Sequence, residues 1–238
     1  MVRRNAFPLL FLCLFPLFGE TDSAYTGQNQ WDEEGPALIY NGRRDVKKIA
    51  LTIDDGWVPD YELLDFLEEE NIPCTVFIPG KLVNYRPEWI LRMDEMGFEI
   101  CGHGYSHHLL PFKTKEEQIE EIHKTESVLK ELTGKDVPRL LRPSGGRLDG
   151  PQPTLPILRE LGYTAILWDN DVRGYYESDT TERQLAWLRK HLQPGNIILS
   201  HFGESMRTRE VLALWIPEVR AQGYEFVLVS ELLEDWEE

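Results

Sequence analysis

The sequence predicts a single α/β domain built around a mainly parallel sheet. From about residue 47 to the C-terminus, short apolar runs alternate with segments of helical period, and no long linker or low-complexity tract interrupts them. This alternation is typical of βα units. A chain of 238 residues with 42% hydrophobic content can also bury one large core. Either an open doubly wound sheet or a barrel satisfies the pattern, and both place function at the carboxyl ends of the strands.

Seven apolar runs are the expected strands, and none of them contains a proline. They are Lys48–Ile53, Thr75–Ile78, Phe98–Cys101, Arg139–Leu141, Thr164–Trp168, Ile197–Ser200 and Glu225–Val229.

The clearest helix signal lies between the third and fourth of these runs. Thr114 followed by Glu117 forms a capping box, and Gly134 marks a helix end, so a helix is expected over Lys115–Thr133. Further helices are expected over Tyr61–Glu70, Pro87–Met96, Leu155–Leu161, Glu182–Leu192 and Arg207–Ala221.

The N-terminus has the layout of a secretory signal. Two arginines precede an apolar run over residues 6–18, which is too short to span a bilayer as a stable helix, and a polar stretch follows. Residues 1–24 are therefore expected to form a signal and cleavage region, residues 25–46 a lead-in, and residues 47–238 the catalytic domain. A retained anchor and a buried N-terminal helix are the alternatives.

Charge and cysteine content narrow the class of protein. A formal net charge of −16 argues against nucleic acid or an anionic membrane surface as a partner and suits a neutral substrate. After cleavage only Cys74 and Cys101 remain, so at most one intramolecular disulfide is possible. Both cysteines lie in apolar runs and are expected to be small buried hydrophobes.

Unusual polar residues cluster where the predicted strands end. Asp54 and Asp55 end the first strand, and the later strands run into "CGHGYSHH", "LRPSGG", "WDND" and "LSHFG". Two adjacent carboxylates repel each other in a poorly hydrated place, so a cation is the expected compensator. A turn in which the aspartates cap a helix is the structural alternative.

His103 and His107 have a spacing that lets two imidazoles converge on one ion. The spacing alone is weak, because histidine pairs are often ordinary polar surface. With one aspartate they would form a hydrolytic site of the zinc type that keeps an open position. The second aspartate would then be free to take a proton from an activated water. His108 is the spare histidine.

These residues resemble the polysaccharide deacetylase family, also called carbohydrate esterase family four or the NodB-homology domain. The resemblance covers about residues 47–233. The family's first motif, T-F-D-D-G, is met by "TIDDG", and its second, H-[ST]-x-x-H, by "HGYSH". The resemblance implies that Asp54 is the general base and that Asp55, His103 and His107 hold one divalent metal ion, most often zinc. It also implies a distorted (β/α) barrel of about seven parallel strands.

Two further motifs supply the remaining catalytic candidates. "RPSGG" is similar to the family's third motif, and the similarity assigns Arg142 to orienting the base. Ser144 and Gly145 depart from the family's proline and aromatic residue, but the Gly145 N–H remains a candidate oxyanion donor. "IILSH" resembles the fifth motif and places His201 as the general acid.

The fourth motif departs most. The family commonly reads W-x-x-D-x-x-D-W, whereas this chain reads "WDNDVRGY", so Gly174 stands where an aspartate would pair with Arg142 and Tyr175 replaces a tryptophan. Asp169, Asp171 or Glu177 could substitute for the missing partner.

The resemblance implies an exported, periplasmic or extracellular hydrolase that removes acetyl groups from N-acetylated sugars of peptidoglycan or chitin-like oligomers. The expected partner is a carbohydrate, with no nucleic acid and no membrane span in the mature chain; the oligomeric state stays open. Two alternatives remain: an amidase or O-acetyl esterase acting on another acyl substrate, and a carbohydrate-binding homologue with weak catalysis.

Overall fold

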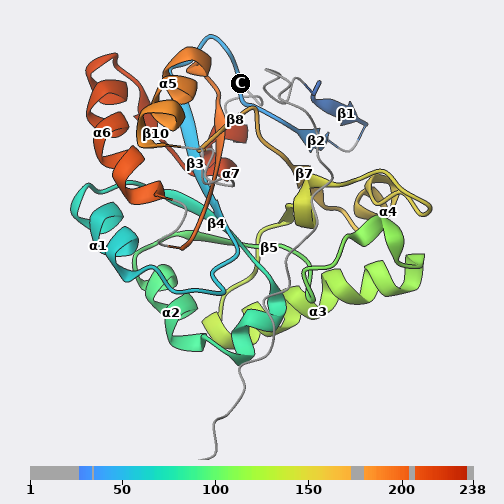
Figure 1. The fold of residues 1–238 in the computed structure, drawn as a ribbon. Helices are drawn as coiled ribbons and strands as arrows, with labels where there is room; N and C mark the ends of the chain where they lie inside the picture. Colours follow the sequence, from blue (N-terminus) through green and yellow to red (C-terminus); the bar gives the residue numbers. More distant parts are fainter. Residues whose placement is uncertain (1–26, 34, 173–179, 204–206, 235–238) are drawn as a thin grey trace, which may run out of the picture.

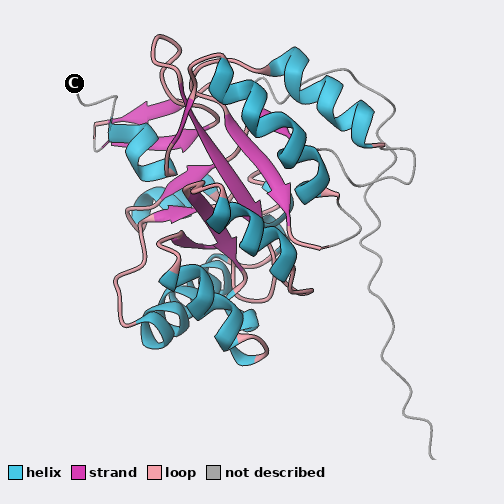
Figure 2. Ribbon diagram, turned by 90° about the vertical axis from the view of Figure 1, so that its left-hand side faces the viewer, coloured by secondary structure: helices cyan, strands magenta, loops and turns pink. Residues whose placement is uncertain are grey.

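A parallel sheet forms the centre of the molecule, and the helices cover its outside (Figures 1 and 2). The computed structural model describes residues 27–33, 35–172, 180–203 and 207–234. The expected signal region, Gly174, Tyr175 and Glu177 lie outside the described residues. Within those residues, no helix is both long and apolar enough to cross a membrane.

All seven expected strands are present. They are β3 (Lys48–Asp54), β4 (Cys74–Ile78), β5 (Glu99–Gly102), β6 (Leu140–Leu141), β7 (Thr164–Ile166), β9 (Ile197–His201) and β10 (Glu225–Phe226). The order β7-β6-β5-β4-β3-β9 is parallel throughout, and β10 adds to β3 in parallel. The prediction of a single (β/α)-type domain is confirmed, as a half-barrel of parallel strands.

Three short strands were not expected from the sequence. β2 (Gly35–Ile39) pairs in parallel with β7, β1 (Gln30–Asp32) pairs antiparallel with β2, and β8 (Asn170–Asp171) pairs with β9. The partners of β2 and β8 lie far away in the sequence, and β1 and β8 have only three and two residues, so these runs carry little local signal. Residues 35–39 therefore join the sheet although they precede the expected catalytic domain.

The helices follow the expected segments closely. They are α1 (Tyr61–Glu69), α2 (Pro87–Glu95), α3 (Lys115–Thr133), α4 (Leu155–Glu160), α5 (Thr181–His191), α6 (Thr208–Ala221) and α7 (Val229–Glu234), with 3₁₀ turns η1 (Gly80–Asn84), η2 (Leu110–Phe112) and η3 (Ser144–Gly146). α3 has the expected capping box and ends at Gly134, whose φ is 71°.

The expected last strand was wrong in its C-terminal part, because α7 begins at Val229. The backbone N–H of Leu228 donates to the Glu231 carboxylate at 2.9 Å, which caps the new helix, and the Val229 N–H donates to Thr75 Oγ1 at 2.9 Å. These two bonds satisfy amides that a continuing strand would have paired with a neighbour.

The core lies between the sheet and the surrounding helices and contains large side chains such as Trp89, Trp215 and Phe77, all fully buried. Cys74 and Cys101 are buried and unpaired with each other, and burial raises the pKa of both thiols well above the ordinary value. They are the small hydrophobes that the sequence predicted.

Candidate active site

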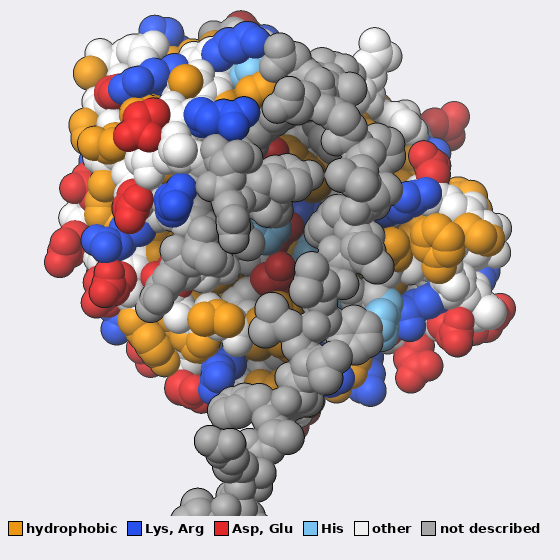
Figure 3. Space-filling model, in the orientation of Figure 1, with side chains coloured by type: hydrophobic (Ala, Val, Ile, Leu, Met, Phe, Trp, Pro, Cys, Tyr) orange, Lys and Arg blue, Asp and Glu red, His pale blue; other side chains and the backbone are white. Residues whose placement is uncertain are grey.

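The carboxyl ends of neighbouring strands bring the predicted site residues to one edge of the sheet. Asp54 at the end of β3 is in register with His201 at the end of β9. His103 follows β5, and Arg142 follows β6, where Gly102 pairs with Leu141. Figure 3 shows histidine and acidic side chains together near the centre of one face of the molecule.

Asp54 and Arg142 form a buried ion pair. Nη1 of Arg142 donates to Oδ1 of Asp54 at 2.8 Å, and Asp54 is only 3% exposed while Arg142 is completely buried. Oδ2 of Asp54 lies 3.7 Å from Nε2 of His103. One carboxylate oxygen is therefore held by the guanidinium, and the other faces the histidines.

Besides Asp54, Arg142 is held by neutral oxygen acceptors. Nη1 donates to Thr52 Oγ1 at 2.7 Å, Nε to the Ile166 carbonyl at 3.2 Å and Nη2 to the Leu167 carbonyl at 3.1 Å. A guanidinium has five N–H donors. Four of them are used within the described residues, counting the bond to Asp54. Arg142 is thus oriented by the ends of β3 and β7.

Asp169 does not take the role of the missing acidic partner. Its carboxylate pairs with Arg44 and accepts the Ile197 N–H at 3.1 Å. Burial raises its pKa, although Arg44 opposes that shift. Glu177 lies outside the described residues, and Asp171 stands in β8, beside β9.

The backbone becomes left-handed at Asp55, the second of the two aspartates. Asp55 has φ of 75° and Gly56 of 104°, and the Asp55 N–H still donates to the Phe77 carbonyl at 3.1 Å. Because the chain leaves the strand pleat at Asp55, the two carboxylates contact different groups. A side chain at residue 56 would begin 3.0 Å from Trp89 and 3.1 Å from Leu82, and the backbone φ is unfavourable for any other residue, so glycine is favoured there.

Asp55, His103 and His107 supply one ligand atom each, and these atoms lie within 4.8 Å of one another. Oδ1 of Asp55 is buried and lies 3.0 Å from Nε2 of His107, but among the described residues it has no hydrogen-bond partner. Nδ1 of His103 is 2.7 Å from the Arg142 carbonyl, which can only accept, so Nδ1 carries the proton and Nε2 keeps its lone pair. The three residues fit a divalent metal ion, and two nitrogens with one carboxylate match a hydrolytic site.

The electrostatics of Asp55 and His103 suit metal ligands. Burial opposes ionisation of Asp55, but contact with His107 and attraction to His103 and His201 hold its pKa below the ordinary value. Burial lowers the pKa of His103, which favours the neutral imidazole. For His107 burial acts in the same direction, but the neighbouring Asp55 outweighs it and raises the pKa. Asp55 is thus ionised and His103 is neutral, the forms that bind a cation.

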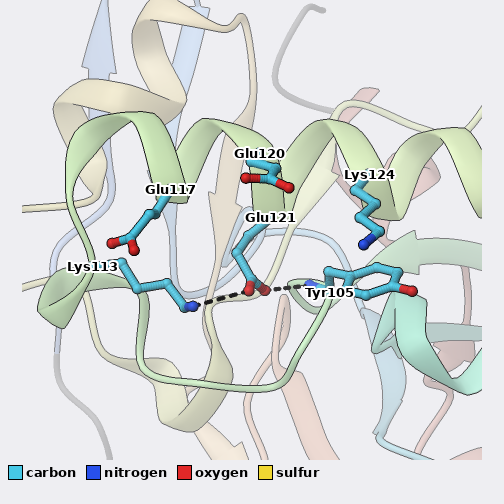
Figure 4. Close-up of a pocket in the computed structure, with 6 residues that line it drawn as sticks. All are labelled: Tyr105, Lys113, Glu117, Glu120, Glu121 and Lys124. Atoms are coloured by element: carbon cyan, nitrogen blue, oxygen red, sulfur yellow. Dashed lines mark hydrogen bonds and ion pairs between the residues drawn. The ribbon is translucent and has the colours of Figure 1, made fainter.

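Two residues of the site have no counterpart in the sequence prediction. Thr52 accepts from Arg142 and donates to the Ile198 carbonyl at 2.7 Å, so it links β9 to the arginine. Glu121 on α3 accepts the backbone N–H groups of Tyr105 and Ser106, at 2.8 and 2.7 Å (Figure 4). Glu121 stands among the buried residues of an amphipathic helix, between Gln118 and Thr125. A charged residue at such a position was a usable sequence signal.

His201 lies at the end of β9, and Gly145 lies in the turn after β6. His201 is half-buried at the end of β9, where Thr208 Oγ1 donates to its carbonyl at 3.0 Å. Gly145 lies in η3 with φ of 65°. The neighbouring Ser144 is buried and donates to the His103 carbonyl at 3.0 Å, which ties this turn to a metal-ligand candidate.

Of the aromatic residues near the site, Trp57 is 38% exposed and its ring centroid lies 6.4 Å from that of His107. The ring of Trp168 lies 5.5 Å from the Arg142 guanidinium carbon, so it packs toward the interior. Trp57 is therefore available to contact a substrate, whereas Trp168 supports the buried ion pair.

Comparison with known proteins gives consistent matches. Residues 41–166 match the family model described as polysaccharide deacetylase. A peptidoglycan-N-acetylglucosamine deacetylase of Bacillus cereus is 33% identical over 79% of this chain and 88% of its own length. The peptidoglycan-N-acetylmuramic acid deacetylase PdaA of Bacillus subtilis is 28% identical over 82% of this chain and 74% of its own length.

The structural matches include a mutant of a CE4 family pseudoenzyme from Bacillus anthracis, described as having restored enzymatic activity. Its TM-score is 0.75 at 26% identity, over 82% of this chain and 71% of that one. The match of more than half of the chain to the family model, together with a relative above 30% identity, shows that this chain belongs to the polysaccharide deacetylase family.

Proposed function

We propose that this protein is a metal-dependent deacetylase that removes acetyl groups from the N-acetylated sugars of peptidoglycan. The observation that carries the proposal is the Asp55–His103–His107 cluster lying beside the buried Asp54–Arg142 ion pair. Peptidoglycan is the proposed substrate class because the relatives of Bacillus cereus and Bacillus subtilis are named as peptidoglycan deacetylases. Those names differ in the sugar, so N-acetylglucosamine and N-acetylmuramic acid are both proposed as substrates.

Asp55, His103 and His107 would hold the ion, and zinc is the proposed metal because these donors with an open position suit it. Such an ion makes water acidic enough to act as a nucleophile near neutral pH and polarises an acyl oxygen.

The chain's own residues would divide the proton transfers. Asp54, oriented by Arg142 through the 2.8 Å bond, takes the proton of the attacking water. His201 returns a proton to the leaving nitrogen, and the Gly145 N–H donates to the developing oxyanion. These roles rest on the motifs and on the positions of the residues at the same sheet edge.

We further propose that residues 1–24 are a cleaved secretory signal and that the enzyme works outside the cytoplasmic membrane. The charged and apolar layout of the segment and the named substrate of the relatives support this.

The proposal is tested by acetate release from N-acetylglucosamine oligomers and from N-acetylmuramic acid-containing peptidoglycan fragments. The purified chain is stripped of metal and reloaded with zinc, beside Asp54→Asn. Zinc-dependent release that Asp54→Asn abolishes supports the proposal. Binding of the fragments without release by the zinc-loaded chain would instead assign a carbohydrate-binding role, which the likeness to a CE4 family pseudoenzyme makes the second candidate.

A further inference from the structure

The loop that carries the metal-ligand candidates has an unfavourable backbone. Gly104 has φ of 72° and His107 has φ of 62°, so two of the five residues from His103 to His107 are left-handed, and one of them is not a glycine. Such a conformation persists only where surrounding contacts determine it.

Backbone bonds hold the first part of this loop. The His103 N–H donates to the Ile78 carbonyl at 3.0 Å, and the carbonyls of Gly104 and Tyr105 accept from the N–H groups of Gly80 and Lys81, both at 2.9 Å. These bonds tie the loop to the end of β4 and to η1, but the amides of Tyr105 and Ser106 need other acceptors.

A side chain from α3 supplies those acceptors. Oε2 of Glu121 accepts the N–H groups of both Tyr105 and Ser106, while Oε1 accepts the Ser106 hydroxyl at 2.6 Å and lies 3.1 Å from Lys113 Nζ. Since the Ser106 hydroxyl donates to Glu121, it accepts from Nδ1 of His108 at 2.8 Å. Figure 4 shows the Glu121 carboxylate between Lys113 and the backbone of Tyr105.

We infer that Glu121 is a positioning residue for metal binding. It orients His107 by holding the backbone immediately before that residue. The carboxylate fixes the two consecutive amides between left-handed Gly104 and left-handed His107, which directs the His107 ring toward Asp55 at 3.0 Å. Lys113 balances the charge that this buried carboxylate brings. The inference rests on the proposed metal site, but it concerns metal affinity and not the acyl substrate.

Removing Glu121 should weaken metal binding without unfolding the protein. Groups that orient metal ligands typically change metal affinity by about 10–100-fold when mutated. We expect Glu121→Ala to raise the dissociation constant for zinc by that factor. Glu121→Gln should have a smaller effect, because its amide oxygen can still accept from the backbone but its NH₂ group faces Lys113.

Glu120→Gln is the matched control. Glu120 is exposed and lines the same surface pocket as Glu121 (Figure 4), and its substitution by glutamine changes the charge by the same amount. The measurement is a zinc titration of the stripped chain in competition with a chromophoric chelator, together with amide hydrogen exchange and the melting temperature without zinc. The inference is supported if Glu121→Ala loses more zinc affinity than Glu121→Gln and if Glu120→Gln keeps the affinity of the unmodified chain. The Glu121 variants should also lose protection from hydrogen exchange at the amides of Tyr105 and Ser106, while their melting temperatures stay close to that of the unmodified chain. A purely structural role would lower the melting temperature and leave zinc affinity intact, which would overturn the inference.

If Glu121→Ala does not fold, Glu121→Gln decides by the same two readouts. An unmodified chain that binds no zinc also overturns the inference. A chain whose zinc affinity depends on Glu121 but which releases no acetate leaves the inference standing and rejects only the proposed function.

Discussion

The two halves of the site are built in different ways. The Asp54–Arg142 half stands on the ends of regular strands, its side chains are at most 5% exposed, and it is held by bonds from β3 and β7. The Asp55–His107 half stands on left-handed backbone, and its side chains are 22% and 27% exposed. The comparison teaches that Asp54, the proposed base, is positioned by the sheet itself, whereas the proposed metal ligands Asp55 and His107 depend on loops that other side chains must hold.

The largest expected difference between the two halves is the difference in kcat and zinc affinity between Asp54→Asn and Asp55→Asn. Asp54→Asn should lower kcat by about 10²–10⁴, the typical contribution of a general base, and leave zinc affinity unchanged. Asp55→Asn should lower both, because it removes the anionic ligand. Steady-state kinetics and zinc titration on the two variants give the answer. Loss of zinc binding in Asp54→Asn would show that the halves are not separate.

Substitutions in the buried Asp54–Arg142 half should lower the free energy of unfolding more than substitutions at the surface. Arg142→Met leaves the Asp54 carboxylate buried without its partner, so the free energy of unfolding should fall by about 3–5 kcal/mol. Arg139→Met is the control, because Arg139 pairs with Glu126 at the surface, where an ion pair contributes about 0–1 kcal/mol. Denaturant unfolding of both variants would measure the difference. Equal effects would mean that the buried pair carries no special stability.

The Asp55–His107 half should depend for its stability on the glycine at residue 56. Gly56→Ala is expected to cost about 1–3 kcal/mol, because its φ of 104° strains a side chain that would also press on Trp89. Gly97→Ala isolates the strain, since Gly97 has φ of 78° and nothing within 4 Å of an added Cβ. If thermal unfolding shows a larger loss of stability for Gly56→Ala than for Gly97→Ala, the difference measures the steric contribution of Trp89 and Leu82. Equal losses would show that there is no such contribution.

The smallest effect is expected from restoring the aspartate that the family commonly has at residue 174. Gly174→Asp should leave kcat/KM essentially unchanged, because four of the five Arg142 donors are already used. Kinetics at saturating metal would test this, with Gly174→Asn as the uncharged control. A large rise in rate for the aspartate alone would show that the strand ends do not hold Arg142 firmly enough.

The regular elements were accessible from the sequence because their signals are local. The capping box of Thr114 and Glu117, with Gly134 beyond it, predicted α3 with the observed ends. The two-residue strand β8 was missed, since a pair such as Asn170–Asp171 becomes a strand only through β9. The boundary at Val229 was missed for a similar reason, because the bond to Thr75 that fixes it joins residues 154 positions apart.

The residue types of the site were also readable, because metal and proton chemistry needs carboxylates and imidazoles and few of these follow strands by chance. The sequence by itself determined the order of strands and helices and the candidates Asp54, Asp55, His103, His107 and His201. The positions of Thr52 and Glu121 could be seen in the sequence, but their partners could not.

Only the tertiary structure decided what holds those candidates. Arg142 finds its acceptors on strands that lie 24 to 90 residues away along the chain, and Glu121 reaches back 15 and 16 residues to two backbone amides. Hydrogen bonds of this kind are short-ranged in space and have no fixed spacing in sequence. A local pattern can therefore name the reacting groups, but the folded backbone decides which neighbours fix their orientation.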